Sequence, residues 1–352
     1  MSCSMVLYRL YDVADNIDLN KAQDLWSASN QISSRLRLAR VSPKAIAFKA
    51  PPLTVELGMQ EIPVAGRNYA VETKARLYDF GVISLVLRLE LPRDIPYEDY
   101  LDLAIATDHL PEDRIQQFAE RVLDTVHAAL LKRRPPEFGE DFTVYYFREW
   151  NDWDVVPLLL KDRSPINEET RQETLSNRLS YANDVAYLVW DSAFVYDPSG
   201  STDIPDLLEF ANAQYLELRY YDGLLEQAIV RMYEAIEDAN TKPGISKLGK
   251  YRRIRREMLE LMSDVTAITS RITNSLRVTE DVFYARVYGV YLRLLRVSAW
   301  KDSILEKVEI IQHSYNQLTD EVVTRRSEVM ELIVILLIAF EIVLTLWEHA
   351  SK

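Results

Sequence analysis

Residues 283–336 read FYARVYGV YLRLLRVSAW KDSILEKVEI IQHSYNQLTD EVVTRRSEVM ELIVIL, and this stretch decides the architecture. Apolar side chains recur in it at alternating spacings of three and four residues, which is the heptad pattern of helices that pack lengthwise. Only Lys301 and Arg325 place a charge at a core position of the pattern. The run therefore predicts one long helix, with the core positions Phe283, Val287, Val290, Leu294, Val297, Ile304, Val308, Ile311, Tyr315, Leu318, Val322, Val329, Leu332 and Leu336.

Two shorter runs with the same spacing come before this stretch. One spans residues 208–236, with Asp222 as its polar interruption, and the other spans residues 251–272. A Pro-Gly break at residues 240–244 separates them. Two packings fit three such runs. The helices can form an intramolecular three-helix bundle, or the third helix can also zip against a copy of itself.

The first 200 residues have a different character, in which strand-like and helix-like segments alternate. Segments 69–77 and 82–91 are rich in apolar side chains, and Asp79, Phe80 and Gly81 between them predict the turn of a β-hairpin. Further expected elements are strands at Met5–Tyr11, Phe142–Trp150 and Ala186–Tyr196, and helices at Asp18–Ser29 and Pro111–Lys132.

The last apolar segment, Leu332–Trp347, is apolar on every face, which indicates complete burial or contact with lipid. Its Leu, Ile, Val and Phe residues favour membrane insertion by about 4–7 kcal/mol together, against about 3 kcal/mol for one buried carboxylate, Glu341. Arg325 and Arg326 precede it, so the positive-inside rule places the bulk of the chain in the cytoplasm. A core helix of a soluble oligomer, with Glu341 in a polar layer, is the alternative.

The predicted fold class is therefore α+β. An N-terminal domain of mixed helices and strands (1–200) is followed by a long-helix bundle or coiled-coil stalk (201–328). A C-terminal apolar helix, expected to be a transmembrane anchor (329–348), completes the chain. The expected location is the inner (cytoplasmic) membrane.

Composition limits the partners that the chain can have. The formal net charge is −13, from 41 basic and 54 acidic side chains, and a surface of that sign repels nucleic-acid phosphates. Cys3 is the single cysteine, which excludes an internal disulfide and suits a reducing compartment. The first residues lack a basic region followed by an apolar core, so no signal peptide is expected.

Three stretches together resemble the required-for-meiotic-nuclear-division family, a domain family of undefined biochemical function. Met330-Glu331-Leu332, the run 333–340 and Glu341 are similar to the way members of that family end, although an aromatic residue is usual at position 332. Tyr11-Asp12 with Ile17-Asp18-Leu19 more weakly resembles the opening strand and following helix of that family, and Tyr78 to Ile83 resembles its aromatic-Gly-Val turn. The resemblance implies a membrane protein, because eukaryotic relatives are associated with the mitochondrial inner membrane and support mitochondrial translation.

No motif predicts catalysis, a cofactor or a metal. Gly244–Tyr251 resembles a phosphate-binding loop, but Tyr251 stands where Ser or Thr must ligate magnesium. Asp79-Phe80-Gly81 matches the magnesium triplet of kinases without their other motifs, and a turn explains it. The four histidines are scattered and none has a second ligand at metal spacing.

A basic cluster at residues 242–277 departs from the acidic composition. It includes Lys250, Arg252, Arg253, Arg255 and Arg256, and its net charge is +6, from nine basic and three acidic side chains. Such a cluster fits contact with RNA or anionic lipid. The alternative is a cationic face that pairs with acidic helices of the same protein.

Glu341 is the sharpest single-residue hypothesis, because a carboxylate in an apolar helix normally faces a partner, such as its own copy in an oligomer. Glu331, at the start of the segment, is the second acidic candidate for an interaction. The sequence thus predicts a membrane-tethered, non-enzymatic scaffold or adaptor, a homo-oligomer with an unknown cytoplasmic protein partner. The alternatives are an RNA- or ribosome-associated factor, and an enzyme without a sequence signature.

Overall fold

The computed structural model describes most of the chain and divides it into two compact units. Unit 1 consists of residues 1–220 and 268–301, and unit 2 consists of residues 221–267 and 302–352. The predicted domains 1–200, 201–328 and 329–348 cut the chain elsewhere and stay a prediction. The structure describes residues 3–28, 32–35, 46–48, 50–92, 94–150, 152–240, 249–260, 262–263, 276–278 and 282–350.

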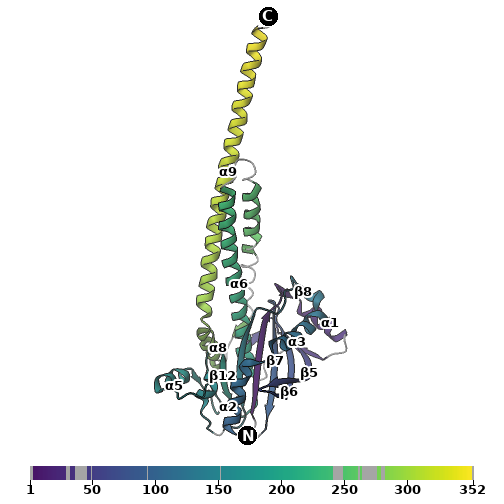
Figure 1. Cartoon of the computed structure of the whole chain (residues 1–352), viewed down its shortest axis with the longest axis vertical. Coiled ribbons are helices and arrows are strands. Elements are labelled where there is room, and N and C mark those ends of the chain that lie inside the picture. The colour runs from purple at the N-terminus through teal and green to yellow at the C-terminus, as the bar shows by residue number, and fades with distance from the viewer. Residues whose placement is uncertain are drawn as a thin grey trace. The chain divides into compact units, whose positions relative to one another are not determined.

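Unit 1 is built on a large sheet whose centre is β1 (Cys3–Asp12) (Figure 1). β1 pairs antiparallel with β7 (Val82–Leu91) on one side and with β9 (Gly139–Phe147) on the other. Among the described residues the strand order is β10-β11-β12-β9-β1-β7-β6-β5-β3, with β12 parallel to β9. The remaining strands are β3 (Ser33–Arg35), β5 (Leu53–Val64), β6 (Arg67–Leu77), β10 (Arg178–Leu179), β11 (Val185–Leu188) and β12 (Ser192–Tyr196).

Short strands and helices complete unit 1. β2 (Asn16–Ile17) pairs with β8 (Leu130–Leu131), and β4 (Ile46–Phe48) pairs with β13 (Leu276–Val278). The helices that precede α6 are α1 (Leu19–Ala28), α2 (Tyr97–Ala106), α3 (Glu112–Thr125), α4 (Val155–Leu160) and α5 (Glu168–Leu175), with single 3-10 turns at Thr107–His109 and His127–Ala129.

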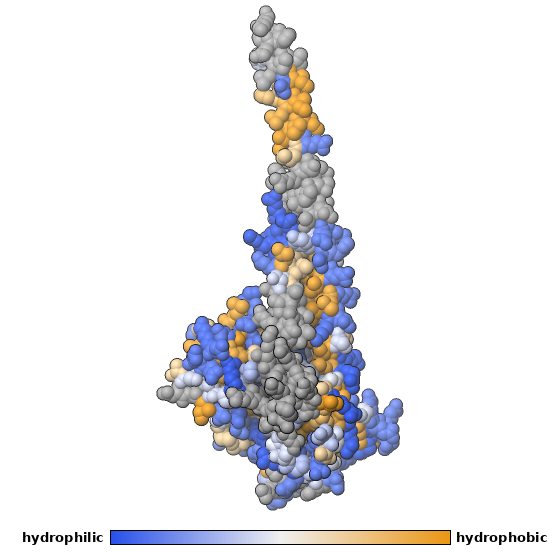
Figure 2. All heavy atoms as spheres, turned by 180° about the vertical axis from the view of Figure 1, so that it is seen from behind, coloured by the Kyte–Doolittle hydropathy of each residue, from blue (hydrophilic) through white to orange (hydrophobic). Residues whose placement is uncertain are grey.

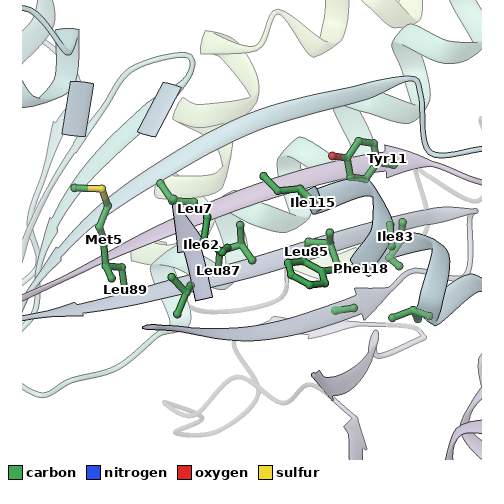
Figure 3. Packing of buried hydrophobic residues seen from close by; sticks show 14 of the residues in the cluster. Met5, Leu7, Tyr11, Ile62, Ile83, Leu85, Leu87, Leu89, Ile115 and Phe118 are labelled. Atoms are coloured by element: carbon green, nitrogen blue, oxygen red, sulfur yellow. The ribbon is translucent and has the colours of Figure 1, made fainter. Parts of the chain in front are cut away.

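The core follows from alternation along the strands. Because successive side chains of a strand point to opposite faces, Met5 and Leu7 of β1 lie on the same face as Leu85 and Leu87 of β7. Figure 3 shows these side chains meeting Ile115 and Phe118 of α3 in one buried cluster. The mixed α+β class predicted for the N-terminal part is confirmed.

The second face of the sheet is also buried. The N-terminal half of α6 (Asp203–Asn240) and α8 (Val282–Leu294) pack on this face. Phe210 of α6 packs 5.9 Å from Tyr78, and Tyr291 of α8 packs 5.4 Å from Phe142, as ring centroids. A sheet covered on both faces buries all ten residues of β1.

Asp79, Phe80 and Gly81 lie in the turn between β6 and β7. Gly81 has a φ of +107°, and a Cβ there would collide with the carbonyl oxygen of Ala14. The turn is also tied to the segment after β1, because Ala14 N–H donates to the Gly81 carbonyl (3.2 Å) and Ile17 N–H donates to the Asp79 carbonyl (3.0 Å). Close backbone approach therefore requires the glycine.

The predicted long helix from Phe283 is wrong in one respect, since it is two helices. α8 ends at Leu294 and α9 (Val297–Ala350) begins three residues later. Arg296 between them adopts a left-handed backbone with a φ of 51°. No glycine or proline marks this position in the sequence, so the heptad pattern continues across it and gives no sign that a helix ends there.

Unit 2 contains the second half of α6, a helical segment at 249–260 and α9 from Asp302 onward (Figure 1). A cavity of about 300 Å³ is lined by all three, through residues such as Met232, Met258 and Ile311. Asp222, the polar interruption of the first heptad run, accepts hydrogen bonds from Ser303 (2.6 Å) and Lys307 (3.0 Å) of α9. Its charge is thus paired inside the helical unit.

The predicted transmembrane anchor needs correction. In the part of the chain that the structure describes, no helix has both the length and the apolar character needed to cross a bilayer. Sixteen residues separate Glu331 from Glu348, where a span needs about 20, and Glu341 interrupts them. The predicted transmembrane helix and the predicted inner-membrane location are therefore wrong, whereas contact of Leu332–Trp347 with lipid stays a prediction.

Candidate functional site

The C-terminal turns of α9 carry a dense set of exposed apolar side chains, here called the apolar segment (residues 330–342). Figure 2 shows them as an orange band on the helix, between bands of polar and undescribed residues. Their exposed fractions lie between 47% and 62%, far above those of a packed helix. The members are Met330, Ile333, Val334, Ile335, Leu336, Leu337, Ile338, Phe340 and Ile342.

The exposure is the same all round the helix. Each residue advances the side chain about 100° around the axis, so the consecutive residues 333–338 sample every direction. All six are exposed, so this part of α9 has no buried face. Burying one such side chain contributes about 1.5–3 kcal/mol, which makes the segment a strong site for association. A helix that is apolar all round needs neighbours on several sides.

Glu331 and Glu341, the two acidic candidates, both lie exposed on this segment. Ten residues along a helix correspond to about 15 Å, so the two carboxylates stand nearly three turns apart. The structure therefore does not bring them together. They bracket the run 332–340 and leave it without an internal charge.

The basic candidates lie on the helical segment 249–260, on its outward side. Arg252, Arg253 and Arg256 are exposed, and Lys250 and Arg255 are half-buried. Arg253 forms an exposed ion pair with Glu257, one helical turn away, at 2.9 Å. The buried residues of the segment are Tyr251, Ile254 and Met258; Lys242, Lys247 and Arg271 of the predicted cluster lie outside the described residues, and Arg277 lies in β13.

Two buried charge clusters, which the sequence did not indicate, hold α6 on the sheet of unit 1. In the first, Arg76 of β6 pairs with Asp206 (2.7 Å) and Glu209 of α6. Both acids are almost fully buried. Burial raises the pKa of Glu209, although Arg76 opposes the shift. Some of the acidic residues that give the chain its negative net charge are thus buried inside unit 1.

The second cluster joins the end of β1 to α6 farther along. Arg134 donates to Asp12 (2.6 Å), also pairs with Asp15, and stacks 4.3 Å from the centre of the Tyr220 ring. Burial raises the pKa of Asp12 to about 6 despite Arg134. Burial and the neighbouring Asp12 raise the pKa of Glu217 well above its ordinary value. Both carboxyl oxygens of Glu217 are buried and make no hydrogen bond within the described structure.

These clusters could not be found from spacing. Arg76 and Glu209 are 133 residues apart along the chain, Asp12 and Arg134 are 122 apart, and the charges of β6 simply alternate with its apolar residues. The available signal was weak: Asp206 and Glu209 stand three residues apart at the start of a helix, where carboxylates also favour the helix dipole without any partner.

Comparison with known proteins assigns the chain to a family. The family described as "Uncharacterized protein MJ0711, N-terminal domain" matches residues 2–203, more than half of the chain, and the protein belongs to it. The uncharacterized protein MJ0711 of Methanocaldococcus jannaschii is 26% identical over 266 residues, which cover 71% of this chain and 80% of the relative. The matched family domain contains the sheet, while the apolar segment lies outside it.

The prediction of a family of undefined function is confirmed in this general form. The family shown is that of the MJ0711 N-terminal domain, and the narrower kinship with the required-for-meiotic-nuclear-division family stays a prediction.

Proposed function

We propose that this protein is a non-enzymatic scaffold or adaptor that assembles with copies of itself through the apolar segment of α9. The observation that carries the proposal is the all-round exposure of the apolar side chains at residues 330–342. Large apolar surfaces exposed on a protein are typical of association sites. Unit 1, with its sheet buried on both faces, would present the recognition surface for a partner protein.

We propose that the apolar segment packs against the same segment of several other copies of this chain. A two-stranded coiled coil buries one stripe of each helix, whereas this segment is apolar on every side. Identical segments also match each other in length and position, so a closed symmetric assembly buries them together. Glu331 and Glu341 would then form polar layers at the two ends of the run 332–340, and Glu341 would hydrogen-bond to its copy.

The proposal is tested by light scattering on the full chain and on the double variant Ile335→Glu/Ile338→Glu. The wild type is expected to be an oligomer and the variant a single chain with unchanged helix content. The matched control is Leu305→Glu, an exposed leucine (59%) of α9 outside the segment, which should leave the oligomer intact. A wild type that is a single chain at micromolar concentration, or a variant of unchanged size, would contradict self-association.

A second candidate function is RNA binding by the basic residues of 249–260. Exposure of Arg252, Arg253 and Arg256 on one side of a helix favours it, and the net charge of −13 disfavours it. Binding of labelled single-stranded RNA should weaken steeply with salt and disappear in Arg252→Glu/Arg256→Glu. Binding that is unchanged by both substitutions would exclude this surface.

We also propose kinship with the required-for-meiotic-nuclear-division family, supported by Met330-Glu331-Leu332 and Glu341. A solved structure of a member of that family should show the strand order found here, with β1 between β7 and β9. A different order of strands would contradict the kinship.

A further inference from the structure

A small pocket lies on the second face of the sheet in unit 1, beside the first turn of α6. Its volume is about 160 Å³, which suits a ligand of a few heavy atoms. Strands β1, β6, β7 and β9 form its floor, and Thr202, Pro205 and Asp206 form one wall. The side chains that matter for recognition are Tyr8, Lys74, Arg76, Arg88 and Tyr146.

Tyr8 lines this pocket with a hydroxyl that has no hydrogen-bond partner among the described residues, although the residue is only 2% exposed. Polar atoms in a protein interior normally have a hydrogen-bond partner, so without a protein partner the Tyr8 hydroxyl is left to solvent or to a ligand in the pocket. Burial, followed by the charges of Glu209 and Asp206, raises the pKa of Tyr8, so the hydroxyl keeps its proton at neutral pH. It therefore offers a hydrogen-bond donor to the pocket.

Arg76 adds a second donor without a hydrogen bond. Its Nη1 is held by Asp206 and Glu209, but its Nε is buried and makes no hydrogen bond within the described structure. The guanidinium is fixed in place by those two buried acids. Its Nε–H therefore has a set position and no protein acceptor among the described residues.

The carboxylates that pair with the other two cations are exposed. Lys74 pairs with Glu72 (2.9 Å) and Glu56 (3.7 Å), and Arg88 pairs with Glu90 (2.6 Å), whose side chain is 63% exposed. Arg88 also donates to the hydroxyl of the buried Ser4 (3.1 Å). Exposed ion pairs contribute little, so Lys74 can turn toward a ligand at small cost, and Arg88 can do so by giving up Glu90 and Ser4. Arg88 is also held over the ring of Tyr146 at 5.7 Å, which keeps it beside the pocket. The wall from α6 adds the positive end of a helix dipole.

From this convergence of donors, we infer that the pocket binds a small oxyanion of the size of phosphate. Three cations, Lys74, Arg76 and Arg88, line it together with two carboxylates, Glu72 and Asp206, and Arg76 is paired with Asp206 and Glu209. The groups that can donate to a ligand are the Tyr8 hydroxyl, the Arg76 Nε–H and the partly exposed cations Lys74 and Arg88. Their common complement is an acceptor-rich anion.

The inference is tested by calorimetric titration of the intact protein with inorganic phosphate and with glycerol phosphate, in chloride buffer of constant ionic strength. Saturable one-to-one binding of either ligand is expected, and glycerol phosphate binding alone would place a phosphate monoester in the pocket. Tyr8→Phe should weaken binding about tenfold, since a hydrogen bond to an anion is lost, and Arg88→Gln should weaken it more.

Tyr181→Phe is the matched control, because Tyr181 is 77% exposed and lies outside the pocket. It should bind like the wild type. Tyr8→Phe removes a hydroxyl without a partner and should leave the melting temperature of the free protein unchanged, so a loss of binding cannot be assigned to unfolding. No saturable binding below about 10 mM, or equal binding by wild type and Tyr8→Phe, would overturn the inference.

Discussion

At the scale of single residues, the main feature of this protein is that charge is used inside the fold as well as on its surface. Asp12 and Asp15 share one arginine, Arg134, and beside them burial raises the pKa of Glu217. Asp206 and Glu209 similarly share Arg76. These residues fix α6 on the sheet, which explains why a helix that contacts a core carries so many acids.

Glu217→Gln should stabilise the protein at pH 8 and leave its stability unchanged at pH 4. A carboxyl with a raised folded-state pKa binds its proton more tightly when folded, so its contribution to stability is present below the unfolded pKa near 4.5. That contribution is lost as pH rises, and glutamine does not titrate. Melting temperatures should differ by a few degrees, at roughly 2–4 °C for each kcal/mol.

Glu169→Gln is the control, since Glu169 is exposed on α5. Its melting temperature should follow that of the wild type across the range. If both substitutions changed the melting temperature equally at pH 8, the pKa of Glu217 would not be raised by burial.

Gly81→Ala should destabilise unit 1 by about 2 kcal/mol or more, because the added Cβ meets the Ala14 carbonyl oxygen as well as an unfavourable backbone angle. Gly66→Ala separates the two effects. Gly66 also has a positive φ of 78°, but open space surrounds its Cβ position. Chemical denaturation should show the larger loss for Gly81→Ala, and equal losses would mean that the close approach at Ala14 is absent.

At the scale of elements, the sequence predicted strongly patterned segments and missed those with interrupted patterns. The alternation around β1 and the hairpin of β6 and β7 could be recognised because core residues recur at every second position. β5 was missed, because the bulge between Glu56 and Gly58 shifts its alternation and Pro63 suggests a break.

The C-terminal helices also contain features that the sequence pattern did not predict. The heptad pattern continues across Arg296, and a positive φ at an arginine leaves no trace in composition. The composition of 332–347 suggested lipid, but Glu341 and the short distance between its flanking acids made that reading fail. Of the candidate site, the exposed acids and arginines could be named from the sequence. The pocket around Tyr8 could not, because it depends on which strands become neighbours.

Arg296→Gly should stabilise the protein by about 1 kcal/mol, since a left-handed backbone is unfavourable for any residue with a Cβ and free for glycine. The comparison is Arg293→Gly, an exposed position inside α8, where glycine should cost about 1 kcal/mol. Denaturant titration of both variants measures the difference. A loss of stability in Arg296→Gly would show that α8 continues into α9 without the turn.

At the scale of the whole molecule, a net charge of −13 opposes assembly, whereas the apolar segment favours it. Repulsion between like-charged chains is screened by salt, and apolar burial is not. The proportion of oligomer should therefore rise between about 20 mM and 300 mM salt, as measured by light scattering at fixed protein concentration. An oligomer that dissociates when salt is added would instead indicate contacts between charges, such as contacts of the arginines of 249–260 with acidic surfaces.

The most direct test of self-association is sedimentation equilibrium of the full chain over a series of dilutions. The account predicts a mass that is a multiple of the 40.8 kDa chain and that falls to one chain when the protein ends at Arg326. A mass of 40.8 kDa for the full chain at every concentration would contradict it, and the apolar segment would then have to serve a different partner.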